Sequence, residues 1–342
     1  MLTVKIASDH GYHPRAAGIS FTKGVRPSAG EVPKAAVAEG ANALRSMATQ
    51  HVPASSSNFG RRFFFLARRF VAGESAQAAM DAIEALNAAG LSATLDFLGE
   101  DVLGRDEALR ARDEYCALLE AIRARGVRTN VSLKLTAMGL LVNEDFAADN
   151  VAAVVAEAAK NADPFVRIDM EGSAIADATL RVFERVHARY TNVGPVLQAY
   201  LKRTPDDLER MMALGVRVRL CKGAYNESAD IAYKAMPMIR RAYLRLAESL
   251  LTRGRYPAIA THDMRIIAAI KDYVAERGIA RDAFEFQMLY GIRPEAQRLL
   301  VGQGFRVRVY VPYGTHWAGY FYRRIMERRE NALFVLGSLL KK

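Results

Sequence analysis

The most constraining feature of this 342-residue chain is a strand–loop–helix unit that repeats with variation after Gly90. Each unit joins a short stretch of strand character to a longer helix-forming stretch. The expected strands are Ala93–Leu98, Val131–Thr136, Phe165–Glu171, Val196–Leu201, Val216–Cys221, Ala258–His262, Phe284–Leu289 and Arg306–Tyr310. Eight such repeats over about 240 residues are typical of an α/β fold in which helices surround a closed parallel barrel. An open doubly wound sheet is the alternative, but it gives no reason for this count.

Helix-forming stretches lie between these strands and also before the first one. The expected helices between strands are Glu107–Arg125, Asn150–Lys160, Ala178–Tyr190, Pro205–Leu214, Ser228–Arg253, Met264–Arg277 and Pro294–Val301. Thr204 as a cap and Pro205 at the first helical position mark the start of the fourth. Ser75–Ala89 predicts a helix before the barrel. We expect residues 1–60 to be irregular or poorly ordered, because they are rich in Ala, Ser, Gly and Pro, and residues 61–342 to form one domain.

The expected strands alternate in polarity, which is unusual for a parallel sheet that is covered on both faces. Alternate side chains of a strand point to opposite faces of the sheet. If the helices cover the face that carries the apolar side chains, the polar side chains line the barrel interior. That interior then contains Asp96, Lys134, Arg167, Asp169, Gln198, Arg217, Arg219, Glu285, Gln287 and Arg308. Burying so many charges is costly unless they are paired or bind a polar ligand.

The polar residues of the interior divide by depth. For the deeper ones we expect an internally satisfied ion network, formed by Asp96, Arg167, Arg217, Glu285 and Arg308. Barrel active sites lie at the carboxyl ends of the strands. The residues nearest those ends are Lys134, Asp169, Gln198, Arg219, Thr261, His262, Leu289 and Tyr310. We therefore expect the functional site among this second group.

The stretch 306–330 predicts a last strand, a turn and a helix that begins at about Thr315. One face of that helix, by its i, i+3, i+4, i+7 spacing, carries Tyr320, Arg323, Arg324 and Glu327. Two guanidinium groups beside an aromatic ring and a carboxylate suit a small carboxylic acid, because each guanidinium can donate two parallel hydrogen bonds. Taken alone, a solvated arginine face is an equally good interpretation.

Composition limits the class of protein. No stretch approaches the roughly 18 apolar residues of a membrane-spanning helix, and the N-terminus lacks the order of a secretory signal, so we expect a cytoplasmic protein. Cys116 and Cys221 have neither CxxC spacing nor neighbouring histidines, so we expect no disulfide framework and no metal site. The net charge is +11, but the Lys and Arg residues are scattered, which does not favour nucleic-acid binding. A basic surface also suits contact with an anionic membrane leaflet.

Common catalytic and nucleotide motifs are missing from the sequence. It contains no GxGxxG after a strand, no GxxxxGK[ST], no HExxH and no GxSxG. After the fifth strand, Gly223 and Ala224 allow a flat ring or a phosphate to approach the backbone closely. Arg219, just upstream, is placed to stabilise negative charge that develops on a reduced cofactor. A phosphate-binding barrel lyase, or an aldolase that forms an imine on Lys134, stays open as an alternative.

Nine short motifs occur in order at the ends of the expected strands and in the last helix. They read LDFLGED (95–101), SLKLTA (132–137), RIDMEG (167–172), LQAYL (197–201), VRLCKGAY (218–225), ATHD (260–263), FQMLYG (286–291), VYVPYG (309–314) and YFYRRIMERREN (320–331). Together they resemble the proline dehydrogenases, flavoenzymes built on a distorted eight-stranded TIM-like (βα)8 barrel. The resemblance covers about residues 69–331.

The resemblance implies a monofunctional, FAD-dependent enzyme of the bacterial type. Such an enzyme oxidises L-proline to 1-pyrroline-5-carboxylate, the first step of proline catabolism, by hydride transfer from proline C5 to flavin N5. It also implies that the electrons pass to a membrane quinone, and hence peripheral contact with the inner face of the plasma membrane.

The resemblance also assigns roles to matching positions of this chain. The substrate carboxylate would be held by Lys134, Arg323 and Arg324. The rest of the proline pocket would be formed by Asp169, Ala224, Tyr225, Leu289, Tyr310 and Tyr320, together with Glu327 on the same face of the last helix. Glu100 would form an ion-pair gate with Arg323. Flavin contacts would come from Gln198, Arg219, Lys222, Gly223, Ala224, Thr261 and His262. The catalytic roles fall on Arg219, Lys134 and Tyr310.

Overall fold

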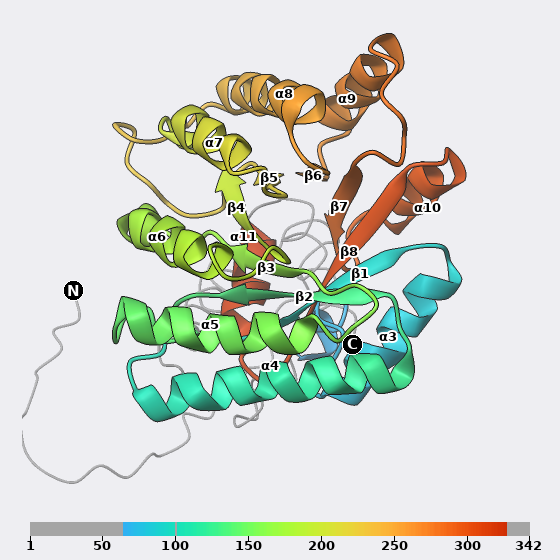
Figure 1. Ribbon diagram of the computed structural model, residues 1–342. Coiled ribbons are helices and arrows are strands. Elements are labelled where there is room, and N and C mark those ends of the chain that lie inside the picture. Colours follow the sequence, from blue (N-terminus) through green and yellow to red (C-terminus); the bar gives the residue numbers. More distant parts are fainter. Residues whose placement is uncertain (1–63, 100, 327–342) are drawn as a thin grey trace, which may run out of the picture.

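The computed structural model describes residues 64–99 and 101–326 of the chain. Its centre is a closed barrel in which each parallel strand pairs with its sequence neighbours and the last pairs with the first (Figure 1). The strands are β1 (Ser92–Phe97), β2 (Thr129–Lys134), β3 (Val166–Asp169), β4 (Val193–Gln198), β5 (Arg219–Cys221), β6 (Ala258–Ala260), β7 (Glu285–Leu289) and β8 (Arg306–Tyr313). The predicted (βα)8 barrel is confirmed.

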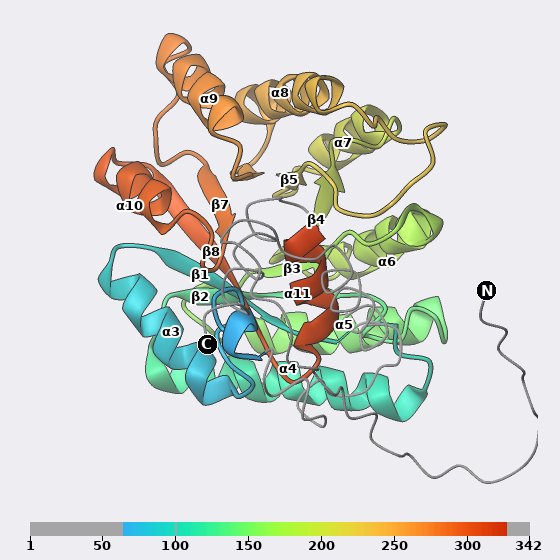
Figure 2. The ribbon, with the colours of Figure 1, turned by 180° about the vertical axis from the view of Figure 1, so that it is seen from behind.

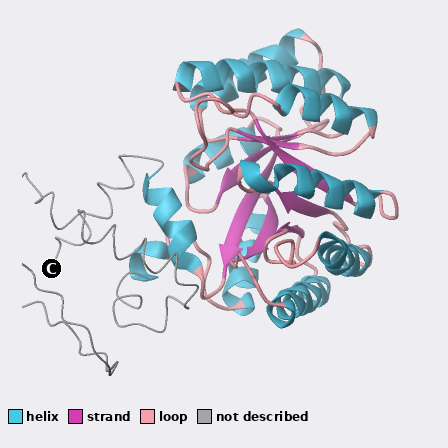
Figure 3. Ribbon diagram, turned by 90° about the vertical axis from the view of Figure 1, so that its left-hand side faces the viewer, coloured by secondary structure: helices cyan, strands magenta, loops and turns pink. Residues whose placement is uncertain are grey.

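Helices cover the outside of the barrel, and Figure 3 shows the strands enclosed by that helical layer. The helices are α3 (Ala76–Ala88), α4 (Arg105–Arg125), α5 (Glu144–Ala158), η2 (Ser173–Ile175), α6 (Ala176–His187), α7 (Thr204–Ala213), α8 (Met236–Arg253), α9 (Met264–Glu276), α10 (Pro294–Gly302) and α11 (Trp317–Met326). The last helix, α11, follows the carboxyl end of β8 and crosses the open end of the barrel, in front of the strands in Figure 2.

The apolar parity of the strands packs against the helices, as predicted. Fully buried side chains of this parity include Leu95, Val131, Leu133, Ile168, Leu220, Phe286 and Val309. They join helix residues in one continuous core. Burying a side chain of this size stabilises the fold by about 1.5–3 kcal/mol. This core fixes the polar parity inside the barrel.

A second apolar cluster holds α11 over the end of the barrel. Trp317 and Phe321 are fully buried and pack with Phe70 and Leu66, from the segment that precedes α3. The ring centroids of Phe70 and Phe321 are 6.1 Å apart. Trp317 also donates its indole N–H to Glu74 at 3.0 Å. The placement of α11 therefore depends on residues far from it in sequence.

The predicted helix Ser228–Arg253 was wrong at its start. Helix α8 begins only at Met236, and residues 222–235 form an irregular connection. The first part of that stretch is mostly exposed and polar or small, so it offers no apolar stripe for a helix to bury. Pro237, in the first turn of α8, favours a helix start there.

Strand β8 is longer than predicted. It continues through Pro312 to Tyr313, and the Tyr313 carbonyl still accepts a hydrogen bond from the Leu98 N–H at 2.8 Å. Pro312 lacks an N–H but its carbonyl accepts from Ala72 at 2.9 Å, so the strand loses only one donor. Thr204 does not cap α7 as expected, because its hydroxyl donates to the Gln198 carbonyl at 2.6 Å.

The deep layer of the barrel interior contains part of the expected ion network, in which Glu285 pairs with Arg308. Arg308 Nε donates to Glu285 at 2.9 Å, and Arg308 Nη1 lies 2.8 Å from Asp163 Oδ2. Arg167 departs from the predicted network because its guanidinium donates to backbone carbonyls, that of Arg217 at 2.6 Å among them.

Two other members of that predicted network also lie elsewhere. Arg217 is only half-buried, and its guanidinium stacks on the rings of Phe165 and Tyr256 at 5.0 and 4.5 Å. Asp96 belongs to the upper layer, where it pairs with Lys134. The deep layer is therefore centred on Glu285 and Arg308.

Candidate active site

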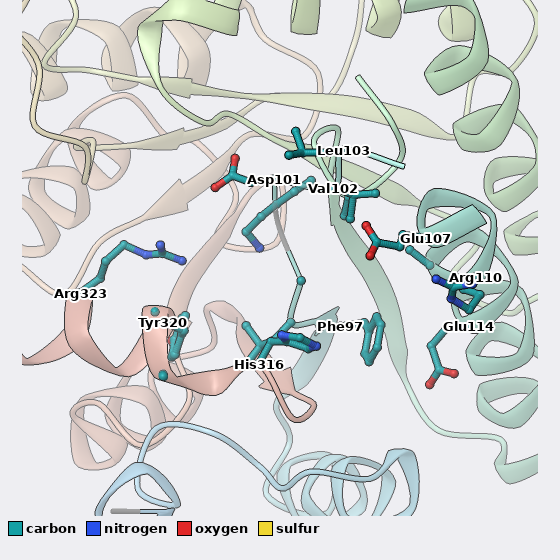
Figure 4. Close-up of a pocket in the computed structure, with 17 residues that line it drawn as sticks. Phe97, Asp101, Val102, Leu103, Glu107, Arg110, Glu114, His316, Tyr320 and Arg323 are labelled. Atoms are coloured by element: carbon teal, nitrogen blue, oxygen red, sulfur yellow. The ribbon is translucent and has the colours of Figure 1, made fainter. Parts of the chain in front are cut away.

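A cavity of about 610 Å³ opens at the carboxyl ends of the strands, between α4, the β1–α4 loop and α11. Figure 4 shows Tyr320 and Arg323 projecting from α11 on one side, and Glu107, Arg110 and Glu114 along α4 on the other. Three of the predicted site residues line this cavity, namely Lys134, Tyr320 and Arg323. Groups that are distant in sequence thus converge on one space.

Lys134, the last residue of β2, forms a buried ion pair with Asp96 of β1. Its ammonium group donates to both carboxylate oxygens, at 3.0 and 3.2 Å. The Asp96 side chain is fully buried and that of Lys134 is 8% exposed. Burial raises the pKa of Asp96, and the nearby Asp169 charge adds to this effect, although Lys134 opposes it. The pair places an ammonium group at the wall of the cavity.

Arg219, the first residue of β5, lies at the centre of the upper layer. Its guanidinium donates to Gln287 at 2.5 Å, to Asp169 at 2.7 Å and to the Ser132 hydroxyl at 3.0 Å. The Asp169 side chain is 15% exposed and that of Arg219 only 6%. Charge-assisted hydrogen bonds from several strands therefore fix the guanidinium in one orientation.

Tyr310 of β8 connects the two ion pairs. Its hydroxyl donates to Asp169 at 2.9 Å and accepts from the Lys134 ammonium at 3.5 Å. The Arg219 guanidinium carbon lies 5.5 Å from the centroid of the Tyr310 ring. Burial raises the pKa of Tyr310 well above its usual value, and the charges of Asp169 and Asp96 act in the same direction. The phenol is therefore neutral and donates to a carboxylate.

Helix α11 brings three of the predicted substrate-binding residues to the mouth of the barrel. Arg323 is half-buried at the cavity, whereas Arg324 is only 8% exposed. The Arg324 guanidinium carbon lies 5.0 Å from the centroid of the Tyr320 ring. Glu100 and Glu327, predicted for the gate and the same helix face, lie outside the described residues.

The predicted flavin contacts lie at the ends of β4, β5 and β6. Gln198 donates to the Glu171 carbonyl at 2.9 Å, and Thr261 is buried. His262 Nε2 accepts the Leu289 N–H at 2.7 Å, which fixes the orientation of its ring.

Lys222 and Gly223 follow β5 in the same region. Lys222 Nζ lies 3.7 Å from Asp263 Oδ2, which also pairs with Arg240 at 2.7 Å. Burial opposes ionisation of Asp263, but Arg240 and Lys222 outweigh it and lower its pKa. Gly223 has φ +111°, and a Cβ there would lie 2.2 Å from the Tyr200 ring, so only glycine fits.

Several predicted substrate residues do not line this cavity. Ala224 is exposed, and Tyr225 is half-buried with its carbonyl accepting from the Tyr200 hydroxyl at 3.3 Å. Asp169, Leu289, Tyr310 and Arg324 do not line it either, although the Tyr310 hydroxyl contacts both Asp169 and Lys134. The predicted substrate residues therefore do not share one space: some line the cavity, some lie inside the barrel, and Ala224 and Tyr225 lie on the loop after β5.

The structure adds residues that sequence reasoning did not assign to the site. Asp96 pairs with Lys134, while Ser132 and Gln287 hold Arg219. The alternation of polar and apolar residues along the strands predicted that Asp96 and Gln287 lie inside the barrel. It did not predict how far each lies from the mouth of the barrel. Within the described part of the chain, no group of three or more His, Cys, Asp or Glu side chains is arranged to hold a metal ion.

Comparisons with known proteins bear on the family and the fold of this chain. The sequence profile of the proline dehydrogenase family matches residues 79–336. Proline dehydrogenase 1 of Bacillus subtilis is 44% identical over 276 residues, which cover 81% of this chain and 91% of that protein. Proline dehydrogenase of Deinococcus radiodurans is 41% identical over 286 residues, 82% of this chain and 92% of that one.

Solved structures of longer proteins share the fold. Proline utilization A from Bdellovibrio bacteriovorus, inactivated by N-propargylglycine, superposes with a TM-score of 0.72 at 25% identity. The match covers 82% of this chain and 34% of that one, so this chain spans about a third of the longer protein. The profile match, the identities and the barrel with its converging polar mouth lead to one conclusion: the chain belongs to the proline dehydrogenase family.

Proposed function

We propose that this chain oxidises L-proline to 1-pyrroline-5-carboxylate with FAD as its cofactor. The observation that carries this proposal is the convergence of Lys134, Tyr320 and Arg323, from β2 and α11, on one cavity at the carboxyl end of the barrel. Cationic groups beside an aromatic ring bind the carboxylate and the apolar ring of a small cyclic amino acid.

In this proposal Arg323, Arg324 and Lys134 bind the proline carboxylate. Arg324 and Lys134 are almost fully buried, so their hydrogen bonds with a carboxylate form in a site that largely excludes water. Asp169 and Tyr310 keep Lys134 and Arg219 in fixed positions through direct hydrogen bonds. The proline ring is thereby oriented before the reaction, which is the main contribution of the protein to such a hydride transfer.

The residues at the ends of β4, β5 and β6 fit a flavin dinucleotide by their chemistry. Lys222 is a cation suited to a phosphate, Gln198 and Thr261 carry neutral polar groups, and Gly223 gives the loop a positive φ that packs it against the Tyr200 ring. With Arg219, Ala224 and His262 they would hold FAD. When bound, FAD would accept the hydride that leaves proline C5, while the amine loses a proton. Arg219 would then stabilise the negative charge that results.

We further propose that Glu100 closes over bound substrate as an ion-pair partner of Arg323. The two residues beside it, Gly99 and Asp101, line the same cavity as Arg323. Asp101 has φ +59°, an unfavourable conformation for a non-glycine residue, as is common in segments that act at binding sites.

The electrons would pass to a membrane quinone, and the basic chain would contact the inner leaflet without inserting. Its net charge of +11 favours such contact. Among the helices of the described residues, none is long and apolar enough to cross a bilayer.

Turnover of L-proline by the FAD-loaded protein tests this function. With a soluble quinone as acceptor, we expect proline-dependent quinone reduction and formation of 1-pyrroline-5-carboxylate, trapped with 2-aminobenzaldehyde. A protein that takes up FAD but reduces no quinone with L-proline would exclude the activity.

The alternative, an aldolase that forms an imine on Lys134, has less support. Lys134 donates to both oxygens of Asp96 and to Tyr310, an arrangement typical of an ammonium group that binds anions rather than of a nucleophilic amine. The imine mechanism predicts covalent labelling of Lys134 by a carbonyl substrate and borohydride, whereas the proposed function predicts none.

A further inference from the structure

The connection from β5 to α8 carries Lys222, Gly223 and Tyr225 away from the carboxyl end of β5 without regular secondary structure. Its two ends are fixed on the segment that follows β4. The Tyr200 N–H donates to the Lys222 carbonyl at 2.9 Å, and the Tyr200 carbonyl accepts from the Tyr233 N–H at 2.8 Å. Between these anchors the chain is largely exposed.

One side chain in the middle of this connection contacts another loop of the site. The Glu227 carboxylate accepts the backbone N–H of Ser173 at 2.7 Å and its hydroxyl at 2.5 Å. Ser173 lies four residues after Asp169, in the connection from β3 to α6. Because β4 separates β3 from β5 in the barrel, this contact joins two connections whose strands are not paired.

The contact has the character of a specific attachment. Glu227 and Ser173 are both half-buried, and each oxygen of the carboxylate has its own donor on Ser173. Hydrogen bonds to an ionised acceptor are roughly twice as strong as neutral ones. Nearby Glu171 is itself fixed by Thr136, so the β3 side provides a rigid point of attachment.

We propose that this contact, here called the Ser173–Glu227 latch, holds Ala224 and Tyr225 in the conformation that binds cofactor and substrate. Glu227 is then a positioning residue, which acts through these two residues, because the Lys222 carbonyl is already held by the Tyr200 N–H. The inference rests on the proposed function, because it assumes that these residues contact FAD and proline. Loss of the latch lets the middle of the connection move while its ends stay attached to the β4 side.

The test uses the variants S173A, E227A and S173A/E227A in the full-length protein. We expect E227A to bind FAD about tenfold more weakly and to show a raised KM for L-proline, with a smaller change in kcat. S173A, which keeps the hydrogen bond from the Ser173 N–H, should show a smaller loss of the same kind. The double variant should be no worse than E227A alone, because E227A already removes both hydrogen bonds. S173T, which keeps the hydroxyl, should restore most of the FAD affinity.

E209Q is the matched control, because Glu209 of α7 forms an exposed, two-bonded contact with Arg253 of α8. FAD affinity is measured by flavin fluorescence, and the unfolding midpoint of each variant is measured without FAD. If E227A had an FAD affinity and a KM within twofold of those of the wild type, the latch would be overturned. A lowered unfolding midpoint of E227A with unchanged FAD binding would also overturn it. If the wild type itself neither binds FAD nor oxidises proline, the proposed function fails instead, and the two failures are distinguishable.

Discussion

The barrel interior contains two layers of buried charge that differ in what surrounds them. In the deep layer Glu285 and Arg308 pair directly, and Arg308 also contacts Asp163 and the Ala93 carbonyl. In the upper layer Lys134 pairs with Asp96, but Lys134 also faces a cavity of about 610 Å³. The deep layer is closed, whereas the upper layer has room for a further anion.

The acids of the two layers also differ in the direction in which their pKa values move. Burial opposes ionisation of Glu285, but Arg308 outweighs it and lowers the pKa of Glu285. Burial dominates at Asp96 and raises its pKa, despite Lys134. Thus the deep layer favours the charged form of Glu285, whereas the upper layer disfavours the charged form of Asp96. This difference is typical of structural and functional ion pairs, respectively.

Removal of one partner in the deep layer should have the largest effect on stability. We expect R308M to lower the free energy of unfolding by about 3–5 kcal/mol, because it leaves Glu285 buried without its main partner. Urea denaturation measures this change. E285Q/R308M should recover part of the loss. A loss below about 1 kcal/mol for R308M would show that the deep layer is not structural.

Removal of a cation in the upper region should instead affect substrate binding. We expect R324M to weaken L-proline binding by about 2–4 kcal/mol, a rise in KM of roughly 30-fold or more, because a desolvated carboxylate loses its partner. Steady-state kinetics measures this, with R306M as control, since Arg306 is exposed and pairs only loosely with Asp282 at 3.6 Å. An unchanged KM in R324M would remove Arg324 from the site.

The two layers should respond to pH in opposite directions. The contribution of Glu285 is present above its unfolded pKa of about 4.5 and is lost as pH falls through its lowered folded pKa. The contribution of Asp96 is present below its unfolded pKa of about 3.8 and is lost as pH rises through its raised folded pKa.

Chemical denaturation from about pH 3 to pH 6 of the wild type, E285Q and D96N checks these signs. A tenfold difference in proton affinity between the folded and unfolded chains corresponds to about 1.4 kcal/mol of stability. The stability of the wild type relative to E285Q should fall toward low pH, and relative to D96N it should fall toward high pH. Parallel curves for the two variants would contradict the comparison.

The smallest effect is expected from removal of the Tyr310 hydroxyl, which is a single group of the upper-layer hydrogen-bond network. Y310F removes the donor to Asp169 and the acceptor for Lys134 but keeps the ring over Arg219. We expect kcat/KM for L-proline to fall roughly five- to thirtyfold, which corresponds to a loss of about 1–2 kcal/mol of transition-state stabilisation. Stability should change less than in R308M, and the reverse order would count against the assignment of the two layers.

The eight strand–helix repeats were enough to predict the barrel, and the period-two alternation along the strands predicted most of the side chains inside it. It could not predict that Asp96 pairs with Lys134 while Glu285 pairs with Arg308, because depth in a barrel depends on the stagger between strands. The start of α8 was missed because Ala-rich and polar residues in 228–235 carry no strong stop signal. The Ser173–Glu227 contact has no local signal, because it joins residues 54 positions apart.

The central claim is that proline binds at this mouth against a flavin and is oxidised there. Anaerobic titration of the FAD-loaded protein with L-proline, followed by its visible absorption, tests it most directly. We predict loss of the flavin absorption in the wild type at proline concentrations that leave R324M oxidised. A wild-type protein that stays oxidised, or equal bleaching of the two proteins at every concentration, would contradict the account.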